Sequence, residues 1–201
     1  VLTFEAVQGL EHMKWAAPNV DQVTYDVTMP YIRMVAGPLD YTQGTMRNAS
    51  KQNYRPVNSE PMSQGTRCRQ LAEYVIFPFS MLCDSPSAYM KETECTDFIA
   101  GIPVVWDTTL ALNGEITKFL TLARKKENVW YVASINNWDI RSIELDLSFL
   151  GEGNFKAEIF RDGLNADKVA RDYKREVVDI PSERKLSFTM APGGGYIMKI
   201  F

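Results

Sequence analysis

The chain has 201 residues, with 22 Lys or Arg, 25 Asp or Glu and a formal net charge of -3, and its pI is about 5.3. This balance argues against nucleic acid as the main partner, because proteins that bind DNA or RNA usually carry a basic face and a high pI. No apolar run approaches the roughly 18 to 20 residues that cross a bilayer. The composition therefore predicts a globular chain that binds neither nucleic acid nor membrane and can bury a substantial core.

The cysteines are expected to be free. There are three of them, so they cannot all pair internally. Cys68 and Cys83 are predicted to lie on one helix, where their spacing separates them by roughly 22 Å, too far for a disulfide.

Up to residue 107 the chain is predicted to mix strands and helices. It starts at Val1 with neither an initiator Met nor a signal sequence, which indicates the middle of a longer protein. The expected elements are a buried strand over residues 1–7, an apolar strand over 31–37, a polar loop over 40–62, and helices over 63–83 and 85–98. Ser63 and Ser85 are expected to cap the helices, Pro86 to open the second one, and Pro78 to kink the first. This order is typical of the last part of a (β/α)8 barrel.

From residue 115 the pattern alternates between apolar and polar residues. Strands are expected over residues 116–123, 129–135, 143–147, 155–160, 176–179, 186–190 and 196–200. The first two flank a polar turn, which indicates a hairpin, and the basic run Arg124-Lys125-Lys126 is expected to be solvated at its tip. Strands of this length and spacing favour an antiparallel β-sandwich. The fold class is therefore α/β plus all-β, divided into an incomplete barrel over residues 1–107 and a sandwich over 108–201.

Two carboxylates near the start of the chain are the sharpest candidates for chemistry. Glu5 interrupts an apolar strand, where a carboxylate must be paired, hydrogen-bonded or bound to a metal. Glu11 follows just past Gly9, where a loop would cross the mouth of a barrel. Two carboxylates at one mouth suit the hydrolysis of a glycosidic bond. The alternative is that both are ordinary salt-bridge partners.

Three blocks of sequence resemble glycoside hydrolase family 97. They are Glu5-Ala6-Val7-Gln8-Gly9-Leu10-Glu11 followed by Lys14-Trp15, Met34-Val35-Ala36-Gly37-Pro38-Leu39-Asp40-Tyr41-Thr42, and Pro103-Val104-Val105-Trp106-Asp107-Thr108-Thr109. The resemblance covers essentially the whole chain in the same order. It implies the C-terminal part of a (β/α)8 barrel followed by the family's C-terminal β domain.

The resemblance also implies an activity and a cofactor. Family members are α-glucosidases or α-galactosidases that act on oligosaccharides with the help of calcium. The position of Glu11 is similar to that of the family's general acid, and Glu5 matches a carboxylate that helps hold the calcium ion. The nucleophile or base would lie on earlier barrel strands. Gln43 stands where Pro is common in the family, which leaves the sugar preference open.

Other residues support weaker expectations. His12, Asp40 and Tyr41 are candidates for substrate binding at the same mouth, although a lone loop histidine is more often a surface residue. The resemblance implies a bacterial periplasmic or secreted enzyme. The alternative function is a non-catalytic carbohydrate-binding or structural module. Dimerisation through residues 1–40, or association with the rest of the barrel, is a further possibility, because an incomplete barrel exposes strand edges.

Overall fold

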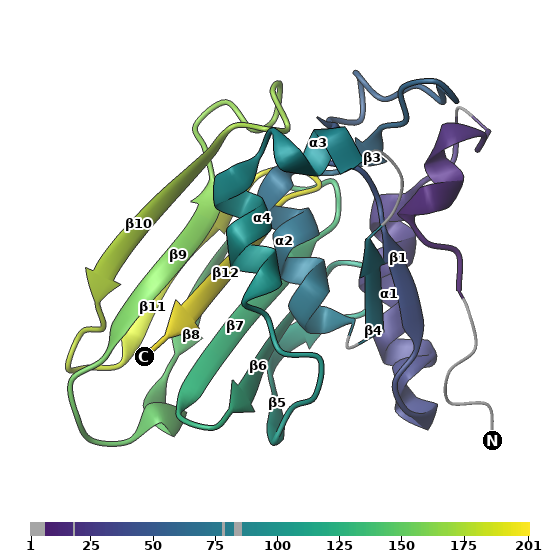
Figure 1. Ribbon diagram of the computed structural model, residues 1–201. Helices are drawn as coiled ribbons and strands as arrows, with labels where there is room; N and C mark the ends of the chain where they lie inside the picture. The colour runs from purple at the N-terminus through teal and green to yellow at the C-terminus, as the bar shows by residue number, and fades with distance from the viewer. Residues whose placement is uncertain (1–6, 18, 78, 83–85) are drawn as a thin grey trace.

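The chain folds into three layers. The computed structural model describes residues 7–17, 19–77, 79–82 and 86–201. A six-stranded sheet forms the middle layer, helices cover one of its faces, and a two-stranded sheet covers part of the other (Figure 1). None of the helices in these ranges is long and apolar enough to span a membrane.

The second half of the chain supplies the sheets. The large sheet has the order β10-β9-β12-β7-β6-β5, and β8 pairs with β11 in the small one, with every pairing antiparallel. The strands are β5 (Thr108–Glu115), β6 (Phe119–Lys126), β7 (Val129–Asn136), β8 (Arg141–Asp146), β9 (Lys156–Asp162), β10 (Tyr173–Asp179), β11 (Lys185–Met190) and β12 (Gly195–Ile200). Antiparallel β structure and the β6–β7 hairpin were expected. Strand β5 was not, because Asn113 and Gly114 inside it are residues typical of turns.

The two faces of the large sheet belong to two different cores. On β6, Leu120 and Leu122 face the helices, whereas Phe119 and Ala123 face the small sheet. Successive side chains of a strand point to opposite faces, so a sheet that is covered on both sides needs apolar residues at consecutive positions. The middle layer is therefore buried from both directions.

The long helix is shorter than the sequence suggested. Helix α2 (Arg67–Ile76) packs against β7, β9 and β12, and its N-cap Thr66 accepts a hydrogen bond from the backbone nitrogen of Arg69 at 3.1 Å. The helix does not begin at Ser63, because β3 (Ser63–Gln64) pairs in parallel with β2 (Asn48–Ala49). It does not extend to residue 83 either, because Phe77 is extended, as a residue before proline prefers.

The chain beyond α2 continues as a strand. Strand β4 (Phe79–Leu82) pairs in parallel with β1 (Asp40–Gln43). The kink expected at Pro78 does not arise within the helix, since the helix ends at Ile76. Position 78 itself lies outside the described residues, as do Ser85 and Cys83. The other two cysteines, Cys68 and Cys95, are free and buried.

Two further expectations for the first half are corrected. The region expected as a strand over residues 31–37 contains the end of helix α1 (Gln22–Ile32) and the 3-10 helix η2 (Met34–Ala36). The single helix expected over residues 85–98 is two helices, α3 (Pro86–Met90) and α4 (Thr93–Ala100), with Pro86 at the first position as expected. The polar loop over 40–62 contains β1 and β2.

The basic run at the hairpin is only partly solvated. Arg124 is buried, and its Nη2 donates a hydrogen bond to the carbonyl oxygen of Ile76 at 3.0 Å. Its guanidinium carbon lies 5.9 Å from the ring centroid of Trp106. Burial lowers the pKa of Arg124 to about 10. This arginine therefore fastens the β6–β7 hairpin to the end of α2, instead of facing water.

Candidate functional site

Glu11 is carried by a short helical turn that is anchored on both sides. The 3-10 helix η1 (Leu10–Lys14) buries Leu10 and Met13. The hydroxyl of Tyr54 donates to the carbonyl oxygen of Met13 at 2.6 Å. At Gly9, a Cβ atom would lie 2.8 Å from the carbonyl oxygen of Thr42 and 2.2 Å from Oε2 of Glu11. The absence of a side chain at Gly9 thus lets Glu11 pack beside the end of β1.

The carboxylate of Glu11 contacts the imidazole of His12. Oε1 of Glu11 lies 2.9 Å from Nδ1 of His12, and the two side chains are 23% and 41% exposed. The other oxygen, Oε2, is buried and has no hydrogen-bond partner among the described residues. One carboxyl oxygen thus contacts the imidazole, while the other faces no hydrogen-bond partner among the described residues.

A shallow hollow lies beside His12. Its volume is about 560 Å³, and it is lined by Val7, Gln8, His12, Trp15, Ala16, Ala17 and Val20. The rings of His12 and Trp15 meet edge to face, with centroids 5.9 Å apart. An exposed indole next to a partly exposed imidazole can offer an apolar face and a polar edge to a sugar ring.

Asp40 and Tyr41 are neighbours on β1 and differ in their surroundings. Tyr41 is buried and stacks on Phe77 with ring centroids 4.2 Å apart. Asp40 is half-buried, and its Oδ1 has no hydrogen-bond partner among the described residues. The structure thus joins Glu11 to His12 and places Tyr41 within the core. The catalytic role of Glu11 and the substrate-binding roles of His12, Asp40 and Tyr41 stay predictions.

The predicted calcium site is only partly covered by the described residues. Glu5 lies outside them. Within the described ranges, no group of three or more His, Cys, Asp or Glu side chains is placed to hold a metal ion. Oδ1 of Asp40 is nevertheless buried without a hydrogen-bond partner in this part of the chain. A hard oxygen donor of this kind fits calcium, so Asp40 can supply a single ligand, but the described residues form no complete site.

A buried charge cluster was missed by the sequence analysis. Nε of Arg69 lies 3.0 Å from Oε1 of Glu73, and its Nη2 donates to Oδ2 of Asp26 at 3.2 Å. All three side chains are buried. Burial raises the pKa of Asp26 to about 6, against the opposing charge of Arg69. Burial also raises the pKa of Glu73 well above its ordinary value. No local signal could have revealed the cluster, because Asp26 and Arg69 come from different helices.

The glycine run before the last strand has a structural role. The backbone nitrogen of Thr66 donates to the carbonyl oxygen of Gly193 at 2.9 Å, and a Cβ at Gly195 would lie 2.4 Å from Cα of Arg69. Oδ2 of Asp162 accepts hydrogen bonds from the backbone nitrogens of Ala191 and Gly195 at 2.9 and 3.1 Å. Only a residue without a side chain permits this close approach of the loop to α2.

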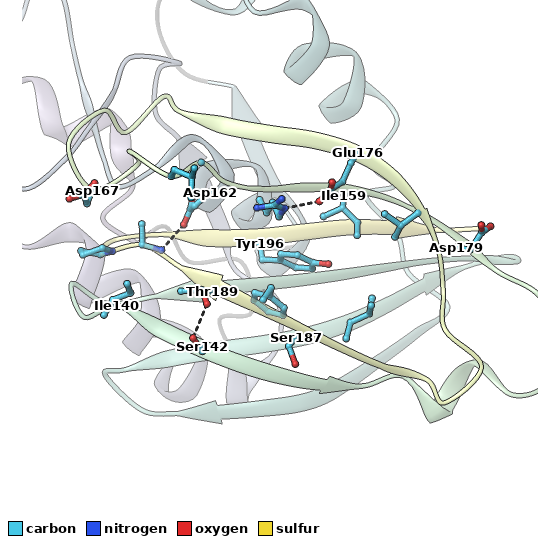
Figure 2. Close-up of a pocket in the computed structure, with 18 residues that line it drawn as sticks. Ile140, Ser142, Ile159, Asp162, Asp167, Glu176, Asp179, Ser187, Thr189 and Tyr196 are labelled. Carbon is cyan, nitrogen blue, oxygen red and sulfur yellow. Dashed lines mark hydrogen bonds and ion pairs between the residues drawn. The ribbon is translucent and has the colours of Figure 1, made fainter.

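The largest hollow that we describe lies in the β half, away from Glu11. It is a groove of about 1000 Å³ between β9 and β10 on one side and β11 on the other (Figure 2). Phe188 and Tyr196 stack at 3.8 Å on its floor. Nε of Arg161 donates to Oε1 of Glu176 at 2.6 Å within the groove. Its size shows that the small sheet does not cover the whole face of the large one.

Comparison with known proteins assigns the chain to a family. Residues 105–201 match the family model described as "Glycosyl-hydrolase 97 C-terminal, oligomerisation". The whole chain is 58% identical to a retaining alpha-galactosidase of Bacteroides thetaiotaomicron and covers 30% of that protein. Over 165 residues, 81% of the chain, it is 25% identical to a probable retaining alpha-galactosidase of Streptomyces bingchenggensis, of which it covers 23%. The chain thus spans less than a third of the length of these relatives.

A solved structure supports the same assignment. A Glycoside Hydrolase Family 97 enzyme from Pseudoalteromonas sp. strain K8, in complex with panose, superposes with a TM-score of 0.82 at 28% sequence identity. The superposition covers 96% of this chain and 30% of that enzyme. The mixed first half is therefore shared with that enzyme together with the β domain. We conclude that the chain belongs to glycoside hydrolase family 97 and that its residues 105–201 match the family's C-terminal domain.

Proposed function

We propose that the longer protein to which this chain belongs is a retaining α-galactosidase and that this chain supplies its general acid, Glu11. The observation that carries the proposal is the identity of 58% over the whole chain to a retaining alpha-galactosidase. The matched region covers both halves of the chain and so includes the segment around Glu11. It favours a galactoside over a glucoside, the choice that the sequence left open.

Glu11 suits the first step of this reaction. In a retaining glycosidase, one carboxylic acid protonates the leaving oxygen while a second carboxylate attacks the sugar, and the same acid then acts as a base toward water. The contact at 2.9 Å with His12 orients one oxygen of Glu11. The other oxygen, which has no partner among the described residues, remains available for the proton. The nucleophile is expected on earlier barrel strands, outside these residues.

Calcium belongs to the proposal as a bound ion near the acid. Glu5 would hold it, and the unpartnered Oδ1 of Asp40 is a donor of the type that it prefers. When bound, the ion would supply positive charge that offsets the repulsion among these carboxylates.

In this proposal, residues 1–107 and residues 108–201 have different roles. We assign residues 1–107 to the last part of the (β/α)8 barrel, an assignment supported by the parallel pairings β1–β4 and β2–β3. Residues 108–201 form a β domain, which we propose mediates oligomerisation, in keeping with the words of the matching family model. Periplasmic or secreted localisation remains part of the proposal on family resemblance.

The test is Glu11→Gln in the full-length enzyme, measured on two α-galactosides that differ in their leaving groups. A general acid matters most when the leaving group is a poor one. We therefore expect kcat/KM on a galactosyl disaccharide to fall by about 10²- to 10⁴-fold and to fall far less on nitrophenyl α-galactoside. Glu60→Gln removes an exposed carboxylate on the loop before β3 and serves as the control.

The outcomes separate the parts of the proposal. Retention of most disaccharide activity by Glu11→Gln would assign the acid to another residue. Faster turnover of nitrophenyl α-glucoside than of the α-galactoside by the unaltered enzyme would overturn the sugar assignment. Activity that survives exhaustive chelation, with no response to added calcium, would remove the ion from the proposal.

A further inference from the structure

The groove in the β half lies between two sheet edges. Strand β10 is the last strand of the large sheet and β11 pairs only with β8, so each borders the groove with an edge that no other described strand covers. Figure 2 shows Glu176 and Asp179 on one side of the groove and Ser187 and Thr189 on the other. Uncovered edges around an open groove are places where proteins associate with other chains.

An exposed apolar knob stands at one end of this groove. Leu164 is 99% exposed and Ile140 is 71% exposed, and both line the groove. In the close-up, Ile140 lies at the same end of the groove as Asp162 and Asp167 (Figure 2). Large apolar side chains that gather at the rim of a hollow mark an interaction surface more often than isolated ones do.

The loop that carries Leu164 is held in place before any partner binds. The backbone nitrogen of Gly163 donates to the carbonyl oxygen of Asp172 at 3.0 Å, and that of Asn165 donates to Oδ2 of Asp172 at 2.8 Å. Ala166 and Ala170 in the same loop are buried. A side chain on an ordered loop can enter a partner with little additional loss of conformational entropy.

A surface that carries both a projecting side chain and a hollow can pair with a second copy of itself. A twofold interface brings the same patch of both subunits together, so that patch must contain both a projection and a hollow that receives it. Leu164 supplies the projection, and the apolar floor formed by Ile159, Phe188 and Tyr196 supplies the hollow.

We propose that a second copy of this chain docks on the groove between β10 and β11, with Leu164 of each copy inserted into the groove of the other. The inference rests on the proposed oligomerising role of the β domain and adds the surface through which it acts. It replaces the surface considered from sequence, residues 1–40, with one in the β half.

The charges around the groove give the association a distinctive salt dependence. The lining contains one cation, Arg161, and four carboxyl groups, those of Asp162, Asp167, Glu176 and Asp179, and Lys174 beside it pairs with Glu176, so carboxyl groups outnumber cations. Two such surfaces repel each other at low ionic strength, and added salt screens that repulsion. An interface held by apolar contact against like charges therefore tightens as salt rises, whereas one held by ion pairs loosens.

Sedimentation velocity of the full-length protein, over about a hundredfold range of concentration, measures the dimer dissociation constant. We expect Leu164→Asp to raise that constant on the order of tenfold or more, since each dimer contains the change twice. Leu164 is fully exposed, so this variant should fold and keep its activity per protomer. Val177→Asp is the matched control, because Val177 is 59% exposed on β10 and alternates with the groove residues Glu176 and Val178.

Each of three results either supports or overturns the proposed interface. Weakening by Leu164→Asp alone, together with tighter association at higher salt, supports the groove. Association that is unchanged by Leu164→Asp but lost in Val35→Asp would place the interface within residues 1–40 and overturn the groove while leaving oligomerisation intact. A monomer at every concentration would overturn both the groove and the oligomerising role, and would leave the assignment of Glu11 untouched.

Discussion

The two halves of the molecule differ in the length of their strands and in the direction in which the strands pair. The described strands before residue 107 are two or four residues long and pair in parallel. Those after it are six to eight residues long and pair antiparallel. Three antiparallel pairings, β5–β6, β6–β7 and β9–β10, join strands that follow one another closely in the chain, whereas both parallel pairings join segments separated by longer stretches of chain.

The placement of charge follows the same division. In the first half, Asp26, Arg69 and Glu73 are buried. In the second half most ion pairs lie at the surface, such as that between Lys174 and Glu176. A buried ion pair contributes little net stability, but the loss of one partner costs a great deal. The first half and its contact with the β domain should therefore be the more sensitive to changes of charge.

The largest expected effect comes from removing Arg69. The variant Arg69→Met leaves the carboxyl groups of Asp26 and Glu73 buried without their cation and also removes the hydrogen bond to the carbonyl oxygen of Asn136 on β7, 3.0 Å long. We expect the free energy of unfolding to fall by about 3 to 5 kcal/mol. Urea denaturation of the 201-residue chain at neutral pH measures it.

A second variant sharpens this comparison. The double variant Arg69→Met, Asp26→Asn removes one carboxylate along with the cation, and it should recover part of the loss if unpaired charge is the cause. If Arg69→Met alone lowers the free energy of unfolding by less than about 1 kcal/mol, both carboxyl groups are protonated in the folded chain and do not need the cation.

The next largest effect concerns Asp162, a buried carboxyl in the β half. Burial raises its pKa from 3.8 to about 6 despite the hydrogen bonds that it accepts. The folded state binds this proton more tightly than the unfolded state does. The stability that the protonated Asp162 contributes is therefore fully present below pH 3.8 and is lost as pH rises through about 6. The amount at stake is on the order of 3 kcal/mol.

The variant Asp162→Asn tests the direction of this pH dependence. The difference in unfolding free energy between the unaltered chain and the variant should be largest at acidic pH and should shrink toward neutrality. Asp26 titrates over the same range in both proteins, so the difference isolates Asp162. A difference that grew with rising pH would mean that the folded state prefers the ionised carboxylate.

The positions of most strands in the β half could be predicted because the residue pattern that marks a strand is local, although half of the strand pairings are not. Its strands alternate between apolar and polar residues, and the turn at Glu127, with φ 54°, joins β6 to β7 where the polar residues indicated. Arg124 is the informative exception. The basic run was expected to be solvated, but the end of α2 covers Arg124. No residue near Arg124 in the sequence indicates that contact.

The first half could be predicted only in outline because its determinants are distant. Residues 22–32 form a helix whose buried face includes the polar side chains of Gln22 and Asp26, so apolar periodicity did not reveal it. Ser63 resembled an N-cap but is part of a strand that pairs with Asn48–Ala49. At the candidate site, the segment around Glu11 was found by its sequence, while the contact with His12 and the burial of Tyr41 required the fold.

The smallest expected effect lies on the surface of the same groove as Asp162 and has the opposite sign. Lys174 and Arg161 lower the pKa of Glu176, at oxygen–nitrogen distances of 2.5 and 2.6 Å. A lowered pKa gives stability that is present above the unfolded pKa near 4.5 and is lost as pH falls. Because the Glu176 side chain is partly exposed and both of its cationic partners are more exposed still, we expect Glu176→Gln to cost only about 0.5 to 1 kcal/mol at neutral pH. Urea denaturation of the dilute chain should show this cost shrinking in high salt and at acidic pH, while the cost of Asp162→Asn grows at acidic pH. If both variants followed the same pH trend, exposure would not be what separates the two carboxyl groups, and the contrast between buried and surface charge would fail within a single sheet.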